Sequence, residues 1–161
     1  MSIKPSLYAF HKKHNARFID FVGWYMPIQY TSILEEHRAV RTKVGLFDVS
    51  HLGQITITGQ QSQIFLDMLV TNDVSALKPG TALYSCMCRE HGGVVDDLII
   101  YCLSHENYLL RINSANTDKD FHWMQKHASA FHCKITDVSN EYALLALQGP
   151  QAKPLLSNLC Q

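Results

Sequence analysis

The sequence has 161 residues, enough for one ordinary domain with a real core. It carries 14 lysines and arginines against 14 aspartates and glutamates, so its formal net charge is zero, and 47% of its residues are hydrophobic. This balance argues against a nucleic-acid partner and against an anionic membrane surface, because both require clustered basic side chains.

Targeting signals do not stand out in the amino-terminal stretch MSIKPSLYAF, which has neither the apolar region of a signal peptide nor an Arg/Ser-rich transit pattern. No apolar run approaches the ~20 residues of a membrane span. The five cysteines are an odd, scattered set, and several fall in apolar, strand-like segments, which is typical of reduced thiols. We therefore expect a cytoplasmic protein without a membrane partner.

The first part of the chain combines an aromatic run with a helix signal. The run FVGWYMPIQY at residues 21–30 could line a pocket for a planar ligand or simply pack, and packing is favoured. Residues 31–45 predict a helix, with Ser32 as N-cap, Glu35 three residues later as its capping partner, and Gly45 as the stop.

A strand and a second helix follow. Residues 51–59 alternate, with Ile55 and Ile57 on one face, which predicts a strand. Residues 60–70 predict a helix whose apolar stripe consists of Ile64, Phe65, Met68 and Leu69.

The rest of the chain reads mostly as strands. Residues 81–90 and 94–103 predict a hairpin around the glycine turn at 91–93. Further segments follow in order: a strand at 108–113, a helix at 114–131 with Phe121, Met124, Ala128 and Phe131 inside, and strands at 132–139 and 142–149.

This order of elements favours the α+β class. From Ile55 to Asp137 the expected sequence is strand, helix, strand, strand, strand, helix, strand. Without one hairpin strand it is the ferredoxin-like split βαβ pattern, an antiparallel sheet with helices on one face.

Two adjacent aspartates, Asp96 and Asp97, interrupt the apolar strand at 94–103. Because strand side chains alternate, the two must point to opposite faces, and at most one can line a given pocket. In one interpretation, one carboxylate faces solvent and its neighbour caps a backbone amide, and the pattern alone favours this. In the other, a carboxylate beside a cleft hydrogen-bonds to a substrate nitrogen or accepts its proton.

A metal site is not predicted. Cys86 and Cys88 share one face of a strand but lack a second pair at zinc-like spacing. Two histidine pairs lack carboxylates at compatible spacing: His11 with His14, and His127 with His132. No phosphate loop or dinucleotide fingerprint appears either.

Several ordered motifs together carry a family resemblance: LYAFHKKHNARFIDFVGWYMPIQY, HRAVRTKVGLFDVSHLGQITITG, GGVVDDLIIY, INSANTDKDFHWM and ALLALQGPQA. They resemble the amino-terminal part of the glycine cleavage aminomethyltransferases (T-proteins), from Ser6 to the end. The resemblance implies transfer of a one-carbon unit from the aminomethyl-lipoyl arm of H-protein to tetrahydrofolate, with release of ammonia. The implied partners are lipoylated H-protein and tetrahydrofolate as co-substrate.

The resemblance also implies site residues. The catalytic aspartate of the family is the second of its pair, which is Asp97 here, and a desolvated acid is tolerated because the folate amines become its partners. Positions that contact folate in the family fall on Leu52, Tyr84, Arg111 and Asn113. Asp48, Ser50 and His51 are expected near the pocket as supporting residues.

Length is the departure from the family, whose members are more than twice as long and form three domains around a folate channel. The resemblance implies that residues 52–137 are the ferredoxin-like middle domain. Residues 1–51 and 138–161 are then an incomplete first domain, and the third domain is absent. We expect a truncated chain or one chain of a split enzyme, inactive alone, whose exposed apolar edge drives self-association.

Two alternatives stay open. One is the folate domain of a dimethylglycine- or sarcosine-oxidising enzyme, and the other is a folate-binding protein without transferase activity. The intact GGVVDDLII motif favours the transferase.

Overall fold

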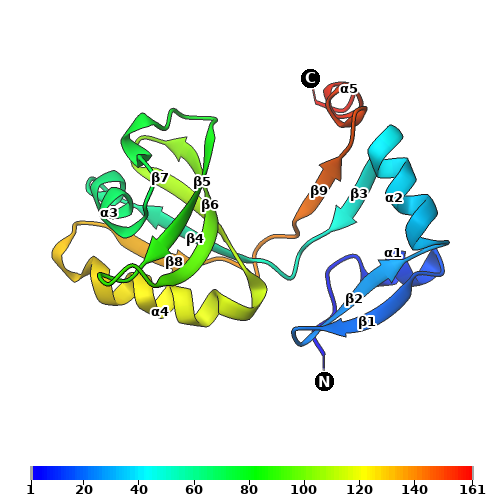
Figure 1. Ribbon diagram of the computed structural model, residues 1–161, viewed down its shortest axis with the longest axis horizontal. Helices are drawn as coiled ribbons and strands as arrows, with labels where there is room; N and C mark the ends of the chain where they lie inside the picture. The colour runs from blue at the N-terminus through cyan, green and yellow to red at the C-terminus, as the bar shows by residue number, and fades with distance from the viewer. Residues whose placement is uncertain (1, 161) are drawn as a thin grey trace. The chain divides into compact units, whose positions relative to one another are not determined.

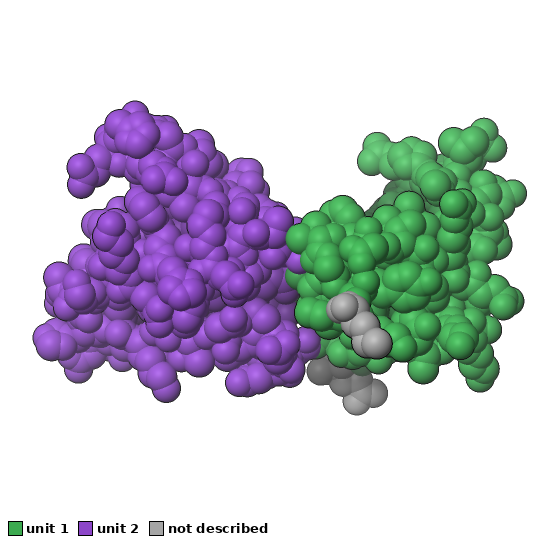
Figure 2. Space-filling model, turned by 90° about the horizontal axis from the view of Figure 1, so that it is seen from below, with its two compact units in different colours: residues 1–51, 143–161 green, residues 52–142 purple. Residues whose placement is uncertain are grey.

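The structure is a computed structural model and describes residues 2–160. Its chain divides into two compact units, residues 1–51 with 143–161 (unit 1) and residues 52–142 (unit 2), which Figure 2 shows in different colours. The domain partition expected from the sequence stays a prediction.

Unit 2 is built on a five-stranded antiparallel sheet with the order β5-β6-β7-β4-β8 (Figure 1). Its strands are β4 (Gly53–Thr58), β5 (Ala82–Cys88), β6 (Val94–Ser104), β7 (Asn107–Ile112) and β8 (Lys134–Asp137). Its helices are α3 (Ser62–Leu69), the 3-10 turns η1 (Val74–Ala76), η2 (Ser114–Asn116) and η3 (Ala128–Ala130), and α4 (Thr117–His127). The α+β class is confirmed, and the ferredoxin-like designation stays a prediction.

The glycine turn between β5 and β6 forms as predicted. Gly92 adopts a φ of 85°, a left-handed conformation that costs glycine no steric clash. Its amide donates to the Arg89 carbonyl, and the Arg89 amide donates to the Gly93 carbonyl, both at 2.8 Å. The two strands therefore run back along each other and bring Asp97 opposite Cys86.

One face of the sheet carries the core. Ile55 and Ile57 of β4 are fully buried together with residues of both α3 and α4, so the two helices cover the same face. The predicted stripe of α3 is wrong in part. Ile64 and Met68 are 59% and 49% exposed. The buried residues of α3 are Ser62, Phe65, Leu66 and Leu69.

Unit 1 contains two small sheets. The hairpin of β1 (Arg17–Phe21) and β2 (Trp24–Gln29) forms one, and the antiparallel pair of β3 (Gly45–Asp48) and β9 (Leu145–Gln148) forms the other. The helices are α1 (Tyr8–Lys13), α2 (Ile33–Thr42) and α5 (Ala152–Ser157). Sequence patterns did not predict α1, β1, β2 or β3.

Little of unit 1 is buried. Among its described residues only Pro5, His11, Met26 and Ser50 fall in the buried class. Apolar side chains of β3 and β9 remain exposed, with Leu46 61% and Leu145 44% accessible.

The expected capping of α2 needs correction. Ser32 occupies the N-cap position, but its side chain makes no capping hydrogen bond. Glu36, not Glu35, reaches back, and its Oε1 accepts from the amides of Tyr30 at 2.7 Å and Thr31 at 2.8 Å. The carboxylate satisfies donors that precede the helix, which is where a helix N-terminus favours negative charge.

Candidate active site

The two adjacent aspartates of β6 point to opposite faces of the unit 2 sheet, as predicted. Asp96 is 7% exposed and lies on the helix-covered face, where it interacts with Asp120 of α4. Asp97 is half-buried on the open face, where Tyr84 of β5 contacts it. The desolvated carboxyl of the pair is thus Asp96, whereas the family resemblance implied a desolvated Asp97.

Asp97 lies in a small hydrogen-bonded cluster on the open face. The hydroxyl of Tyr84 donates to Asp97 Oδ2 at 3.1 Å, and Asn113 Nδ2 lies 3.2 Å from Asp97 Oδ1. Tyr84 is 61% exposed, so the cluster is open to solvent on one side. The arrangement holds a carboxylate in a defined orientation where a ligand can reach it.

Asn113 links the two faces. It follows the last residue of β7, and its Nδ2 lies 3.1 Å from Asp96 Oδ1 and 3.1 Å from the Asp97 carbonyl oxygen. All these atoms accept hydrogen bonds, so the amide nitrogen must face them and the amide oxygen must point away. Asn113 therefore couples the buried aspartate to the accessible one.

Behind Asp96 lies a carboxyl that sequence patterns did not identify. Asp120 on α4 is fully buried and forms an ion pair with Lys119, whose Nζ is 3.3 Å from Asp120 Oδ1. Lys119 also donates to the Val95 carbonyl. One signal was available, because Asp120 precedes the buried Met124 by one helical turn and so falls on the apolar face of its helix.

The electrostatics of the cluster follow from burial and hydrogen bonding. Burial, followed by the interaction with Asp96, raises the pKa of Asp120 to about 7. For Asp96, burial opposes ionisation, but hydrogen bonds from Asp120 and Asn113 outweigh it and lower its pKa. The hydrogen bond to Asp97, and then its charge, raise the pKa of Tyr84.

The two remaining predicted site residues lie elsewhere in unit 2. Arg111 of β7 pairs with Ile99 and Gln54, so it shares the open face with Asp97 two positions along β6. Within residues 2–160, no hydrogen bond or ion pair joins it to Asp97. Leu52 precedes β4 and is 8% exposed.

The predicted supporting residues belong to unit 1. The carboxylate of Asp48 accepts from His11 Nε2 at 2.8 Å and from the Ser50 amide at 3.0 Å. His11 Nδ1 lies 2.5 Å from the Tyr30 hydroxyl. Burial opposes ionisation of Asp48, but the hydrogen bonds from His11 and Ser50 outweigh this effect and lower the pKa of Asp48. The ring of His51 packs edge-on against Phe21.

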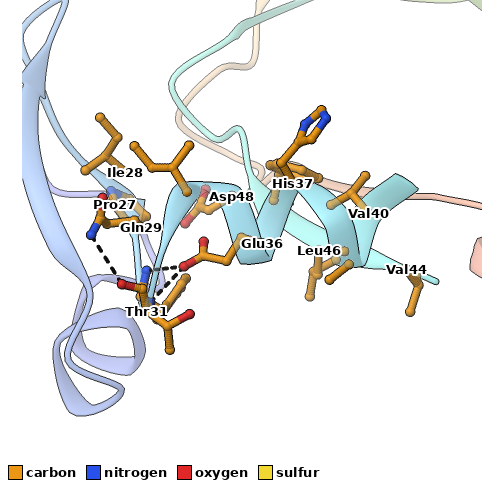
Figure 3. Close-up of a pocket in the computed structure, with 15 residues that line it drawn as sticks. Pro27, Ile28, Gln29, Thr31, Glu36, His37, Val40, Val44, Leu46 and Asp48 are labelled. Carbon is orange, nitrogen blue, oxygen red and sulfur yellow. Dashed lines mark hydrogen bonds between the residues drawn. The ribbon is translucent and has the colours of Figure 1, made fainter. Parts of the chain in front are cut away.

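A cavity of about 490 Å³ lies in unit 1 between β2, α2 and β3. Figure 3 shows that its lining is largely apolar, with Ile28, Val40 and Leu46 around the polar Glu36 and Asp48. Tyr30 of the predicted aromatic run also lines it. Glu36 is already bonded to backbone amides, as the dashed lines show, so its carboxylate is committed to the fold.

Residues 2–160 contain neither a metal-binding cluster nor a membrane-spanning helix. No group of three or more His, Cys, Asp or Glu side chains is arranged to hold a metal ion. In the same part of the chain, none of the helices has the length and apolar character needed to cross a membrane.

Residues 7–161 match the GCVT N-terminal domain family. The chain belongs to this family. The match includes every residue of the Asp97 cluster, so the cluster lies within the family domain.

Two curated relatives of this GCVT-domain chain are named aminomethyltransferase. The chain is 53% identical over 158 residues to the aminomethyltransferase of Halalkalibacterium halodurans, covering 98% of the chain and 43% of that protein. It is 51% identical over 156 residues to the aminomethyltransferase of Desulfitobacterium hafniense, covering 97% of the chain and 43% of that protein. The chain therefore spans less than half the length of these curated relatives.

Two solved structures are similar to this chain. The crystal structure of glycine cleavage system aminomethyltransferase T from Bartonella henselae matches with a TM-score of 0.92 at 37% identity, over 98% of this chain and 44% of that one. The heterotetrameric sarcosine oxidase from Corynebacterium sp. U-96 matches with a TM-score of 0.51 at 17% identity, over 78% of this chain and 61% of that one. The second likeness is one of fold alone.

Proposed function

We propose that the whole protein containing this chain is a glycine cleavage aminomethyltransferase. It takes the aminomethyl group from the lipoyl arm of H-protein and passes the one-carbon unit to tetrahydrofolate. In the balanced reaction, the carbon leaves sulfur and nitrogen and bonds to two folate nitrogens. The products are 5,10-methylenetetrahydrofolate, ammonia and the free lipoyl thiol.

The observation that carries this proposal is the cluster of Tyr84, Asp97 and Asn113 on the open face of the sheet. A carboxylate fixed by two donors can accept a hydrogen bond from a folate amine and stabilise positive charge that develops there. It can also accept the proton that the attacking nitrogen loses. We assign the catalytic role to Asp97.

Further residues are assigned to folate binding. Tyr84 and Asn113 orient Asp97 and present polar groups to the pterin, and Arg111 adds a positive charge on the same face. Leu52 supplies an apolar contact. The domain partition expected from the sequence, with residues 52–137 as a middle domain, and a cytoplasmic location belong to the same proposal.

The experiment is single-turnover formation of methylenetetrahydrofolate from aminomethyl-loaded H-protein, measured on the whole protein. We expect one equivalent of product per active site and a matching equivalent of ammonia. Free glycine or unloaded H-protein should give none. If loaded H-protein and tetrahydrofolate yield no product, the assignment is wrong.

Self-association of the 161-residue chain is a separate part of the proposal. Leu46 of β3 and Leu145 of β9 present apolar surface in unit 1. Sedimentation velocity over a range of concentrations should detect dimers or larger species, and Leu46→Ser should weaken them. A monomer at all concentrations would contradict this part.

A further inference from the structure

Asp120 is a buried ionisable group for which the proposed reaction has no direct use. Asp120 belongs to α4 and is fully buried, with 0% of its surface exposed. Asp96 of β6, which interacts with it, is 7% exposed. Neither lies on the open face with Asp97. A carboxyl in such a position is costly to bury unless it is paired or protonated.

The hydrogen bonds around the two carboxyls are incomplete without a proton between them. Asp96 Oδ1 accepts from Asn113, and the Asp97 amide and the Asn116 side chain add weaker interactions with the Asp96 carboxylate. Among residues 2–160, however, no N–H or O–H group makes a hydrogen bond of normal geometry to the buried Asp96 Oδ2. Both oxygens of Asp120 are also buried, and their interactions are with Asp96 and with the Lys119 ammonium. A protonated carboxyl has an O–H donor that an ionised carboxylate lacks, so one proton on Asp120 would give this pair of acceptors a donor.

We propose that Asp120 is a positioning residue that shares one proton with Asp96 and thereby fixes the Asn113 amide, which in turn orients Asp97. The link to catalysis rests on the proposed function. The proton sharing itself is inferred from the burial of the two carboxyls and from their carboxyl oxygens that lack a hydrogen-bond donor.

The orienting effect follows from the count of hydrogens on Asn113. Its Nδ2 has two hydrogens and three acceptors within 3.2 Å: Asp96 Oδ1, Asp97 O and Asp97 Oδ1. With Asp120 protonated, Asp96 is a single anion satisfied on both oxygens. If Asp120 loses its proton, two anions face each other, Asp96 Oδ2 loses its donor, and Asn113 is drawn toward Asp96 and away from Asp97.

Few other charges act on Asp120. From its own helix, the Lys119 ammonium favours ionisation, and from β6 the Asp96 carboxylate opposes it. β4 (GQITIT) has no charged side chain, and β8 (KITD) contributes Lys134 and Asp137 at its exposed ends. From η2 and its N-cap come only the neutral Asn116 and Asn113. Burial and the Asp96 charge together outweigh Lys119, and the pKa of Asp120 is raised to about 7.

The test is an NMR titration of the 161-residue chain with carbon-13 at the aspartate carboxyls. One aspartate should titrate near neutral pH, and Asp120→Asn should remove that transition. Asp118→Asn is the matched control, because Asp118 is exposed on the same helix and its loss should leave the transition in place. If no aspartate of the unmodified chain titrates above about pH 6, the shared proton does not exist.

A second measurement tests whether the Asp120 proton acts on Asn113. The side-chain amide resonances of Asn113 should shift with the same midpoint as Asp120 and become insensitive to pH in Asp120→Asn. An Asn113 amide that ignores the transition would overturn the positioning role. Because neither readout uses folate, failure to bind folate would contradict the proposed function alone.

In the whole protein, tetrahydrofolate affinity should weaken by up to about tenfold from about pH 6 to about pH 8.5. Asp120→Asn keeps a neutral donor next to Asp96, so its affinity should stay flat over this range. If the tetrahydrofolate affinity of Asp120→Asn had the same pH dependence as that of the unmodified protein, Asp120 would have a structural role only.

Discussion

The hydroxyl of Tyr84 donates a 3.1 Å hydrogen bond to Asp97 Oδ2 across the β5–β6 pair. The two residues come from neighbouring strands and meet on the face of the sheet that no helix of unit 2 covers. On the other side of the carboxylate, Asn113 completes its fixation. The two contacts therefore hold the Asp97 carboxylate in one orientation at an accessible position.

Replacing the acid itself is the most direct prediction. Asp97→Asn should lower kcat/KM for methylenetetrahydrofolate formation by about 10²- to 10⁴-fold, because an amide can neither accept the proton nor stabilise a cation. Stopped-flow or single-turnover assays of the whole protein measure this. Asp118→Asn is the control and should keep nearly full activity, since Asp118 is exposed on α4. Near-normal turnover of Asp97→Asn would remove the carboxylate from the mechanism.

Tyr84 provides a reporter of the same contact in the 161-residue chain. Asp97 raises the pKa of Tyr84 by hydrogen bonding and by charge, because both favour the neutral phenol. Asp97→Asn should therefore lower the pKa of Tyr84 toward its ordinary value. NMR of tyrosine ring carbons follows the titration, and Tyr84→Phe assigns the signal. An unchanged pKa of Tyr84 in Asp97→Asn would show that the carboxylate does not act on the phenol.

The stability of unit 2 should decrease as pH rises, because Asp120 ionises. Its pKa is raised to about 7 in the folded chain, so ionisation opposes folding and stability falls as pH rises from about 4 through about 7. Asp120→Asn cannot ionise. We expect it to be more stable than the unmodified chain at about pH 8, by at least about 1 kcal/mol, and to lose that advantage near pH 5.

Urea unfolding, followed by tryptophan fluorescence in a Trp24→Phe background, measures the stability difference between Asp120→Asn and the unmodified sequence. The sequence has two tryptophans, and Trp123 of α4 then reports unit 2 alone. Asp118→Asn should show no such pH-dependent gain in stability over the unmodified chain. Equal pH dependence of Asp120→Asn and the unmodified chain would mean that the carboxyl does not change protonation in this range.

Asp48 should show the opposite pH dependence in unit 1. Its folded pKa is lowered, so its ionised form contributes stability above the ordinary value of 3.8, and that contribution is lost as pH falls through the folded pKa. Asp48→Asn should cost about 1–3 kcal/mol at neutral pH, because hydrogen bonds to a buried charge are lost. The difference from the unmodified chain should shrink in acid.

The measurement uses a Trp123→Phe background, in which Trp24 of β2 reports unit 1. Glu35→Gln is the control, because Glu35 is exposed on α2 and accepts no hydrogen bond among the described residues. A constant effect of Asp48→Asn from neutral pH to pH 3 would show that packing, and not charge, makes this contact important.

The sequence determined the features that depend on local periodicity. Alternation of Ile55 and Ile57 predicted β4, the glycines at 92–93 predicted the hairpin, and the period of two placed Asp96 and Asp97 on opposite faces. These outcomes need only neighbouring residues, because side-chain direction within one strand follows from backbone geometry. The family resemblance was likewise carried by contiguous motifs.

Tertiary structure decided everything that depends on which surfaces meet. In α3 the apolar residues allow two overlapping stripes, and packing on the sheet selected Leu66 over Met68. Strand β3 is short and pairs with β9, a partner about 100 residues away, so no local pattern marks it. The meeting of Asp96 with Asp120 arises in the same way. Two carboxyls share a buried position only because the fold excludes water from both, and burial is a property of the assembled chain.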